Sequence, residues 1–263
     1  MSERKGHSDI LEDIKTMLEF YQALGIEGIP ITLREPETAG TAASSVPCSI
    51  KKNAGPEMMT GEGAEAVRRS KYSREEKIAL LKEVRETIGD CTRCKLSKHR
   101  TNIVFGEGNP DAKIMFIGEA PGKEEDIQGL PFVGDAGILL TKLIEKMGLK
   151  RSDVYIGNII KCRPPMNRDP EEDEIATCRQ FIERQIEIIN PEVIITLGRI
   201  ALQTFMDNRK IKITAVRGKF FDFKGVPVMP TFHPAYLLRN PSDKWKTWAD
   251  AQKVLERIGH SGN

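Results

Sequence analysis

Short apolar segments alternate with amphipathic segments along most of this chain. The apolar segments have the length and composition of strands buried on both faces, and they occupy residues 113–118, 153–160, 193–198 and 226–232. Helical patterns lie between them: 136–147, which ends at Gly148, 170–189, and a third helix that begins after Gly198. This alternation predicts an α/β fold with a mainly parallel sheet covered by helices on both faces. In such a sheet, functional residues gather at the carboxyl ends of the strands.

Capping patterns refine two of these helices. Ser73 and Glu76 form a capping-box pattern ahead of an apolar periodicity at Ile78, Leu81, Val84 and Ile88. Before the helix over 170–189, Asp169 is placed to cap, Pro170 to take the first turn, and Glu172 to complete a second box.

The chain divides into three parts by composition. Residues 1–30 contain an amphipathic helix over 8–24, whose apolar face would suit a protein partner. Residues 31–71 are rich in small and polar residues without periodicity, which predicts a flexible linker. Residues 72–263 form the compact domain. Cys48 lies in the linker, and we expect it to have no role.

Net charge and hydropathy limit where the protein can reside and what kind of nucleic-acid surface it can have. The net charge is only +2 over 263 residues, so any nucleic-acid surface must be a local patch. No apolar run reaches the roughly 18 residues of a membrane span, and the first residues lead into no signal core. We therefore expect a cytoplasmic protein without membrane contact, and a monomer. In a reducing compartment, cysteines more often serve metals or catalysis than disulfides.

Four cysteines in the compact domain have the spacing of a metal centre. Cys91 and Cys94 form a C-x-x-C pair, Cys162 follows a strand, and Cys178 lies on the inward side of the helix over 170–189. Four thiolates from separate elements suit zinc or an iron–sulfur cluster, and the spacing does not separate the two. Unrelated buried cysteines are the alternative. A redox C-x-x-C fits poorly, because this pair follows a helix that ends at Gly89.

The loop after the first strand combines a glycine-rich turn with charged and aromatic residues. Gly118-Glu119-Ala120-Pro121-Gly122 could cradle a phosphate, although it matches no established nucleotide-binding pattern. The acidic run Lys123–Asp126 suits a solvated surface or a source of catalytic carboxylates. Phe132 would be either a core residue or a platform for a flat ligand.

Polar residues also occur at the ends of two other strands. Asn158 stands in an apolar strand, where its amide could bind backbone groups or the edge of a base. His233 alone of the four histidines ends a strand, which favours a functional role. Basic residues surround the Pro-rich loop after Asn158 and are expected to meet phosphates: Lys161, Arg163 and Arg168.

Taken together, these segments resemble the family-4 uracil-DNA glycosylases. The likeness covers about residues 74–258 and includes the cysteine spacing. The matching segments are Gly118–Gly122, Gly129–Gly137, Asn158–Pro165, Arg217-Gly218 and His233–Arg239. The resemblance implies a three-layer α/β/α sandwich, a structural [4Fe–4S] cluster on Cys91, Cys94, Cys162 and Cys178, and excision of uracil from single- or double-stranded DNA.

The resemblance also implies residue roles. Phe132 would stack on the flipped base, Asn158 would bind its edge, and His233 would stabilise negative charge on the leaving uracil. Gly118, Glu119 and Ala120 would shape the base and water sites. The segment after His233, with Leu237, Leu238 and Arg239, would enter the DNA, with Arg163 on its backbone.

The chain departs from better-known relatives at two positions. Other uracil glycosylases carry Asp where this chain has Ala120 and Tyr where it has Gly122, so water activation must be arranged differently, with Glu119, Glu125 or Asp126 as candidates. A related branch crosslinks to DNA through a His in an inserted loop. The segment Pro164–Pro170 lacks that His, which favours ordinary turnover. A DNA-binding or polymerase-associated module without glycosylase activity is the alternative function.

Overall fold

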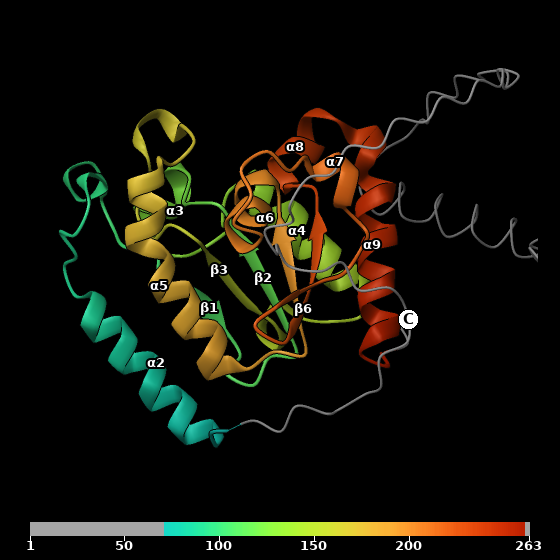
Figure 1. Cartoon of the computed structure of the whole chain (residues 1–263), viewed down its shortest axis with the longest axis horizontal. Helices are drawn as coiled ribbons and strands as arrows, with labels where there is room; N and C mark the ends of the chain where they lie inside the picture. Colours follow the sequence, from blue (N-terminus) through green and yellow to red (C-terminus); the bar gives the residue numbers. More distant parts are fainter. Residues whose placement is uncertain (1–70, 261–263) are drawn as a thin grey trace, which may run out of the picture. The chain divides into compact units, whose positions relative to one another are not determined.

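The structure, a computed structural model, describes residues 71–260, and its centre is a six-stranded sheet (Figure 1). The strand order is β1-β3-β2-β4-β6-β5. Their bounds are β1 Glu107–Gly108, β2 Ile114–Gly118, β3 Tyr155–Asn158, β4 Val193–Leu197, β5 Phe221–Phe223 and β6 Val226–Thr231. The four central strands are parallel, and β1 and β5 pair antiparallel at the edges. The predicted α/β class with a mainly parallel sheet is confirmed.

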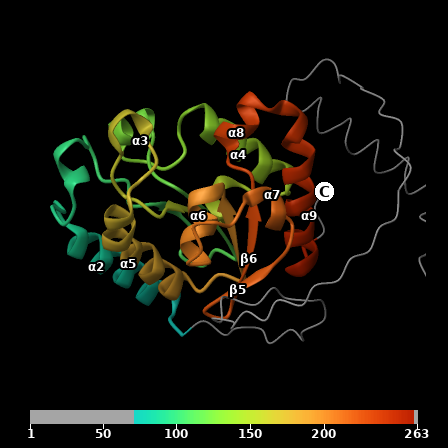
Figure 2. The ribbon, with the colours of Figure 1, turned by 45° about the horizontal axis from the view of Figure 1, so that its top comes forward.

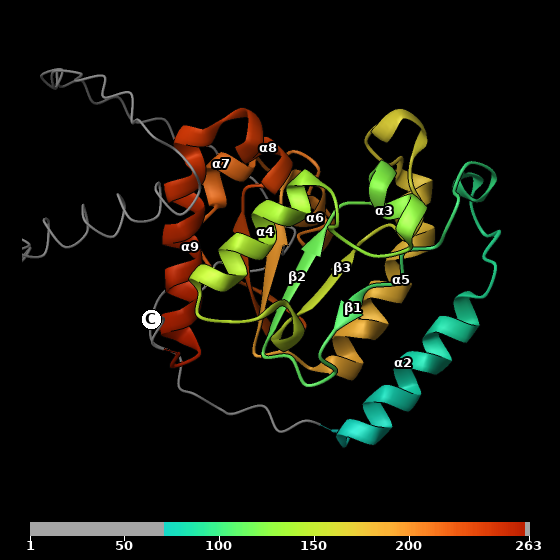
Figure 3. The ribbon, with the colours of Figure 1, turned by 180° about the vertical axis from the view of Figure 1, so that it is seen from behind.

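Helices cover both faces of this sheet. Figure 1 shows α5 (Glu172–Ile189) and α6 (Arg199–Phe205) on one face, with α2 (Arg74–Ile88) packed outside α5. Figure 3 shows α4 (Asp135–Lys146) on the other face, with α9 (Lys244–Arg257) beside it. Strand side chains alternate between the two faces, so Met115 and Ile117 join the core cluster that includes α5. The resulting three layers are those expected from the sequence.

Short helices follow the carboxyl ends of the strands. Figure 2 brings this edge of the sheet forward, with α3 (Lys123–Gln128) and α8 (Pro234–Arg239) on either side of it. The remaining short helices are η1 Lys95–Lys98, η2 Arg151–Asp153, η3 Pro165–Asn167, α7 Ile213–Val216 and η4 Pro241–Asp243. No helix within residues 71–260 combines the length and apolarity needed to cross a bilayer.

The capping predictions were right for one helix and wrong for another. Ser73 Oγ accepts from the Glu76 N–H, and Glu76 accepts from the Ser73 N–H, as the box at α2 predicts. Helix α5, however, begins at Glu172, and Glu174 accepts from the Glu171 N–H. Asp169 does not cap it, because its carboxylate pairs instead with Arg199 on α6 at 2.5 Å.

Two sequence expectations lie outside the described residues: the helix over 8–24 and the linker with Cys48. The acidic run Lys123–Asp126 was left open between a solvated surface and a carboxylate source. It forms the start of helix α3, where Lys123 and Glu124 are exposed, and Asp126 is buried and accepts hydrogen bonds from the Thr101 and Asn102 backbone.

Candidate active site

A pocket of about 420 Å³ opens at the carboxyl ends of β2, β3 and β6. This size is within the usual range for small-ligand sites. Residues from four separated segments line it: Glu119, Ala120, Pro121, Gly122, Glu125, Phe132, Ala136, Asn158, Pro164, Asn167, Arg168, His233, Ala235, Tyr236 and Arg239. The parallel register explains the convergence, since Gly118 on β2 stands opposite Asn158 on β3.

Asn158 presents an unused acceptor to this pocket. The side chain is 1% exposed, and its Oδ1 has no hydrogen-bond partner among the described residues. A buried polar atom without a partner costs free energy, on the order of 1–3 kcal/mol, which a bound donor would recover. Asn158 is therefore prepared to accept a hydrogen bond from a ligand.

The lack of a side chain at Gly118 shapes the floor of the pocket. A Cβ at this position would lie 2.5 Å from Asn158 Oδ1 and 2.6 Å from Phe132 Cζ. Phe132 also approaches Gly137, where an added Cβ would lie 1.8 Å from the Phe132 carbonyl oxygen. The Phe132 backbone is left-handed, with φ at 52°, which is unusual for a bulky residue. The absence of side chains at Gly118 and Gly137 therefore lets Phe132 pack close to the Asn158 amide. Phe132 is both a buried residue and part of the pocket wall.

His233 is held as a neutral imidazole with a defined tautomer. Its Nδ1 accepts from the Ala235 N–H at 3.1 Å, so in the neutral ring the proton is on Nε2. Burial, assisted by the positive charge of Arg239, lowers the pKa of His233 to about 4, although Glu125 opposes the shift. At neutral pH the side chain is therefore an uncharged hydrogen-bond donor.

Glu125 and Glu119, the two candidate carboxylates, have different surroundings. Glu125 Oε1 accepts from the Val133 and Gly134 N–H groups, and its Oε2 accepts from the Gly122 N–H. Glu125 therefore fastens the loop that carries Phe132. Burial and the nearby Asp169 charge raise the pKa of Glu119 to about 7, with Arg199 acting in the opposite direction. Such a carboxyl can exchange a proton near neutral pH.

Some of the expected DNA contacts do not fit the structure. Lys161 is 1% exposed, and its ammonium donates to the Phe105 carbonyl and Gln185 Oε1. The Arg168 guanidinium makes two bonds to the buried carboxylate of Glu174. The prediction that Lys161 meets phosphates is wrong, because its side chain fills an interior site. Arg168 pairs with Glu174 but is 34% exposed and lines the pocket, so its phosphate contact stays a prediction. Arg163 lies at the surface of the loop and donates to Asn167 Oδ1 at 2.7 Å.

Helix α8 separates the expected wedge residues. Leu238 is 43% exposed and Arg239 is exposed at the pocket, whereas Leu237 is 4% exposed. Successive helical residues point about 100° apart, and here Leu237 faces the interior while Leu238 faces outward. The expectation that Leu237 reaches DNA does not fit this geometry, and Leu238 remains a candidate.

The four cysteines lie in one neighbourhood. Cys162 and Cys178 belong to the core cluster, and Cys91 and Cys94 pack against it. Burial raises the pKa of the Cys162 thiol, the Arg100 guanidinium opposes this shift, and charges on Cys94 and Cys91 add smaller increases. Burial likewise raises the pKa of Cys178 to about 12, with contributions from Cys162 and Cys94.

Three donors point at these sulfur atoms. Arg93 approaches Cys91 Sγ at 3.2 Å, the Lys161 N–H approaches Cys178 Sγ at 3.3 Å, and Arg100 approaches Cys162 Sγ at 3.5 Å. None of the four forms a disulfide within residues 71–260. In that same range, no three His, Cys, Asp or Glu side chains are close enough together to hold a single metal ion.

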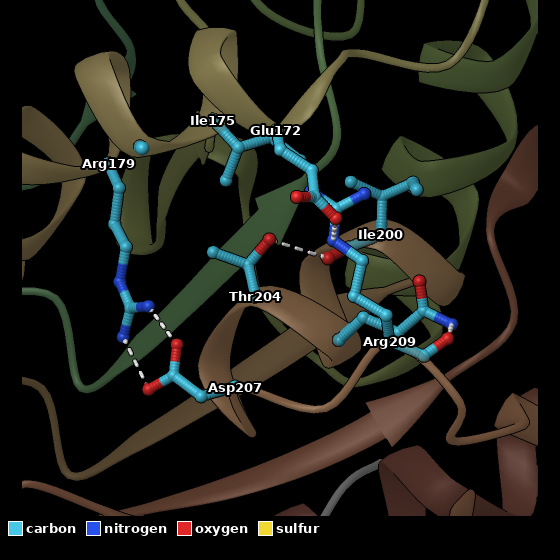
Figure 4. Close-up of a pocket in the computed structure, with 9 residues that line it drawn as sticks. Glu172, Ile175, Arg179, Ile200, Thr204, Asp207 and Arg209 are labelled. Carbon is cyan, nitrogen blue, oxygen red and sulfur yellow. Dashed lines mark hydrogen bonds and ion pairs between the residues drawn. The ribbon is translucent and has the colours of Figure 1, made fainter.

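A second hollow, about 260 Å³, lies between α5 and α6 and is drawn in Figure 4. Its charged side chains pair with one another: Arg179 with Asp207, and Arg209 with Glu172 at 3.0 Å. Because these charged groups already pair with one another, the hollow has fewer free polar groups to bind a ligand than the first pocket has.

Comparison with known proteins agrees with this site. A model of the uracil DNA glycosylase superfamily matches residues 105–257. The type-4 uracil-DNA glycosylase of Thermotoga maritima is 54% identical over 194 residues, which cover 73% of this chain and 100% of that protein. That of Archaeoglobus fulgidus is 43% identical over 186 residues, covering 68% and 94%. A DNA polymerase of Bacillus phage SP01 is 33% identical over 137 residues, covering 52% of this chain and 15% of the polymerase.

Proposed function

The chain belongs to the uracil DNA glycosylase superfamily, and from this premise we propose that it is a type-4 uracil-DNA glycosylase that removes uracil from DNA and leaves an abasic site. The observation that carries the proposal is the unpartnered Asn158 oxygen at the base of the pocket. Uracil carries an N–H between two carbonyl groups. The Asn158 amide can accept from that N–H and donate to the neighbouring carbonyl.

Reaching this pocket requires the uracil to leave the helical stack. Flipping costs a few kcal/mol of unstacking, which contacts made by the extruded base must offset. Phe132 supplies an apolar wall for one face of the ring, and Asn158 supplies hydrogen bonds to its edge. Thymine differs by one methyl group and cytosine by its hydrogen-bonding edge, so discrimination rests on pocket shape and on Asn158.

His233 acts on the bond that breaks. As the glycosidic bond lengthens, positive charge develops on the sugar and negative charge on the leaving uracil. A neutral Nε2–H donor in a site with little water stabilises that negative charge by roughly 3–4 kcal/mol. The low pKa of His233 suits this role, since the ring donates without holding a net charge that would need its own partner.

Glu119 lines the pocket, and we assign it the role of accepting a proton from the attacking water. Its pKa near 7 leaves a large fraction ionised at neutral pH, yet basic enough to take a proton. Glu125 is engaged with three backbone N–H groups and serves to shape the loop. The assignment of water activation to Glu119 replaces the Asp that other uracil glycosylases carry at the position of Ala120.

We propose that the four cysteines hold a [4Fe–4S] cluster, as the resemblance to the family-4 glycosylases implies, with zinc as the alternative. A zinc ion would draw all ligand sulfurs to about 2.3 Å from one point. In a cubane each cysteine binds a different iron, so the sulfurs stand further apart around a larger centre. Cys91, Cys94, Cys162 and Cys178 are neighbours, and three donors pointing at their sulfur atoms would stabilise thiolate charge in either kind of centre. The cluster would join α2, β3 and α5, and it would supply no chemistry to glycosidic cleavage.

The alternative, a polymerase-associated binding module, is less well supported. The likeness to the phage polymerase covers a small part of that protein, whereas the chain spans the whole of the Thermotoga maritima glycosylase. Binding alone would not require a neutral His233 donor and a Glu119 carboxyl with a raised pKa in the same pocket.

The test uses end-labelled oligonucleotides that carry one uracil, as single strands and opposite G or A. The full-length protein should produce alkali-labile sites at uracil, and none in matched oligonucleotides with thymine or cytosine. A His233→Ala protein, prepared in parallel, excludes a contaminating glycosylase. DNA binding without base release would contradict the proposal.

A further inference from the structure

An exposed apolar side chain lies in a segment that borders the pocket. Met166 is 92% exposed, in the loop between β3 and α5. Its neighbours Pro164, Asn167 and Arg168 all line the pocket. A single exposed apolar side chain is ordinary at a protein surface, so what distinguishes Met166 is its position beside the pocket and its constrained backbone.

The backbone holds Met166 in this position. Met166 and Asn167 both have left-handed backbone angles, with φ at 52° and 54°, a conformation that is uncommon outside glycine. Two hydrogen bonds close the turn: Asn167 N–H to the Pro164 carbonyl and Arg168 N–H to the Pro165 carbonyl, both at 3.1 Å. Strained backbone that the surroundings enforce is typical of functional loops.

Side-chain anchors fix the loop at both ends. Arg163 Nε donates to Asn167 Oδ1 at 2.7 Å, and Arg168 binds both carboxylate oxygens of buried Glu174. Pro164 and Pro165 restrict the chain between these anchors. Met166 is therefore presented by a braced loop, and contact with it requires little ordering of the backbone.

The opposite wall of the pocket carries a second exposed apolar residue. Ala235, Tyr236 and Arg239 of α8 line that wall, and Leu238 is exposed next to them. Figures 1 and 3 show the loop between β3 and α5 well separated from α8 along the same edge of the fold. A nucleotide that enters the pocket must pass between these two walls.

We propose that Met166 packs against the base next to the flipped uridine on the same strand. The inference rests on the proposed function. Flipping leaves one gap in the duplex, and a single side chain fills it. Leu238 is exposed on α8 and is suited to fill that gap. Met166 would then contact the neighbouring nucleotide instead. A thioether side chain adapts to the face of any base, so this contact would be tolerant of sequence.

Under this proposal, Met166 and Leu238 contribute differently to the binding of single-stranded and duplex DNA. A gap exists only in a duplex, whereas a neighbouring base exists in single strands as well. Met166→Ala should weaken binding of uracil-containing single strands and duplexes alike, by about two- to tenfold, the scale of a contact between a thioether and an aromatic ring. Leu238→Ala should weaken binding to duplexes only. Met166→Leu, which keeps an apolar side chain, should retain wild-type affinity.

The decisive measurement removes the base instead of the side chain. Uracil-containing strands are prepared with an abasic residue on either side of the uridine, and fluorescence anisotropy gives the affinity. In the wild-type protein, loss of one of the two neighbouring bases should weaken binding, and in Met166→Ala that loss should have no further effect. Ile78→Ala, an exposed apolar residue on α2, is the matched control.

Three results would overturn the proposal: Met166→Ala without effect, an effect confined to duplexes, or equal sensitivity of wild type and Met166→Ala to the missing base. Failure of the proposed function would be visible separately, since the wild-type protein would then release no uracil while anisotropy still reported on Met166.

Discussion

The rings of Phe132 and His233 lie with their centroids 5.6 Å apart and their planes inclined by 32°. Phe132 lies between α3 and α4, in the connection that follows β2, and His233 lies just after β6; β4 separates these two strands in the sheet. The pair places an apolar surface and a hydrogen-bond donor on the same pocket. A flat heterocycle that lies on Phe132 would have its edge within reach of both His233 and Asn158.

His233→Ala should slow uracil release by about a hundredfold or more in single-turnover reactions, the usual scale for a lost charge-stabilising donor. DNA affinity should change little, because the imidazole carries no charge at neutral pH. The rate and the affinity are measured on the same duplex. An unchanged rate in a folded variant would remove His233 from the mechanism.

Asn158→Asp should exchange part of the uracil activity for activity on cytosine. A carboxyl group at this buried position can accept from the exocyclic amine of cytosine, whereas uracil offers a carbonyl oxygen at the same place. Uracil release should fall at least about tenfold, on the scale of the 1–3 kcal/mol lost with a base contact. Release from cytosine-containing oligonucleotides should become measurable. Asn158→Ala is the control, and it should lose uracil activity without gaining the new one.

The pH profile should report Glu119. Because the pKa of this carboxyl is raised to about 7, the group is protonated below that pH and cannot accept a proton from water. The single-turnover rate should therefore rise with pH and level off above about 7. No second inflection from His233 should appear until the pH approaches 4.

Neighbouring charges offer a control on that assignment. Asp169→Asn removes a negative charge that raises the Glu119 pKa and leaves Arg199 to lower it. The inflection should move to lower pH in Asp169→Asn and disappear in Glu119→Gln. An inflection that stays in place in both variants would belong to another group.

Cys178→Ser should reduce stability before it affects chemistry, because cluster binding is coupled to folding. Protein purified without oxygen should be brown and should contain iron and sulfide, whereas Cys178→Ser should lose the colour and melt at a lower temperature. Cys48→Ser is the control and should keep both. Colourless wild-type protein with stoichiometric zinc would overturn the iron assignment, though not the reaction.

A chain that starts at Lys71 should keep nearly full excision activity. The superfamily match begins at residue 105, and the capping box of α2 at Ser73 remains intact in such a chain. Activity is compared with that of the full-length protein on single- and double-stranded DNA. A folded but inactive product would show that residues 1–70 contribute to the site.

Local sequence pattern was enough to locate the four central strands and to single out Asn158 and His233 as candidate site residues. Buried parallel strands need near-continuous apolar runs, so β2, β3, β4 and β6 could be located from local pattern alone. Asn158 and His233 stood out because a polar residue at the end of such a run lies at the edge where sites form. The short elements β1, β5 and α3 carried too little pattern to be seen.

Which charged and apolar side chains are exposed to solvent or to a ligand depends on the tertiary structure and could not be predicted from local sequence. Lys161 and Arg163 look alike in sequence, but Lys161 is buried because Phe105 and Gln185 fold over it. Glu119 and Glu125 likewise differ only through their neighbours, one close to Asp169 and the other among three backbone N–H groups. Burial and pKa depend on residues that are distant in the chain and adjacent in space, so local sequence does not contain them.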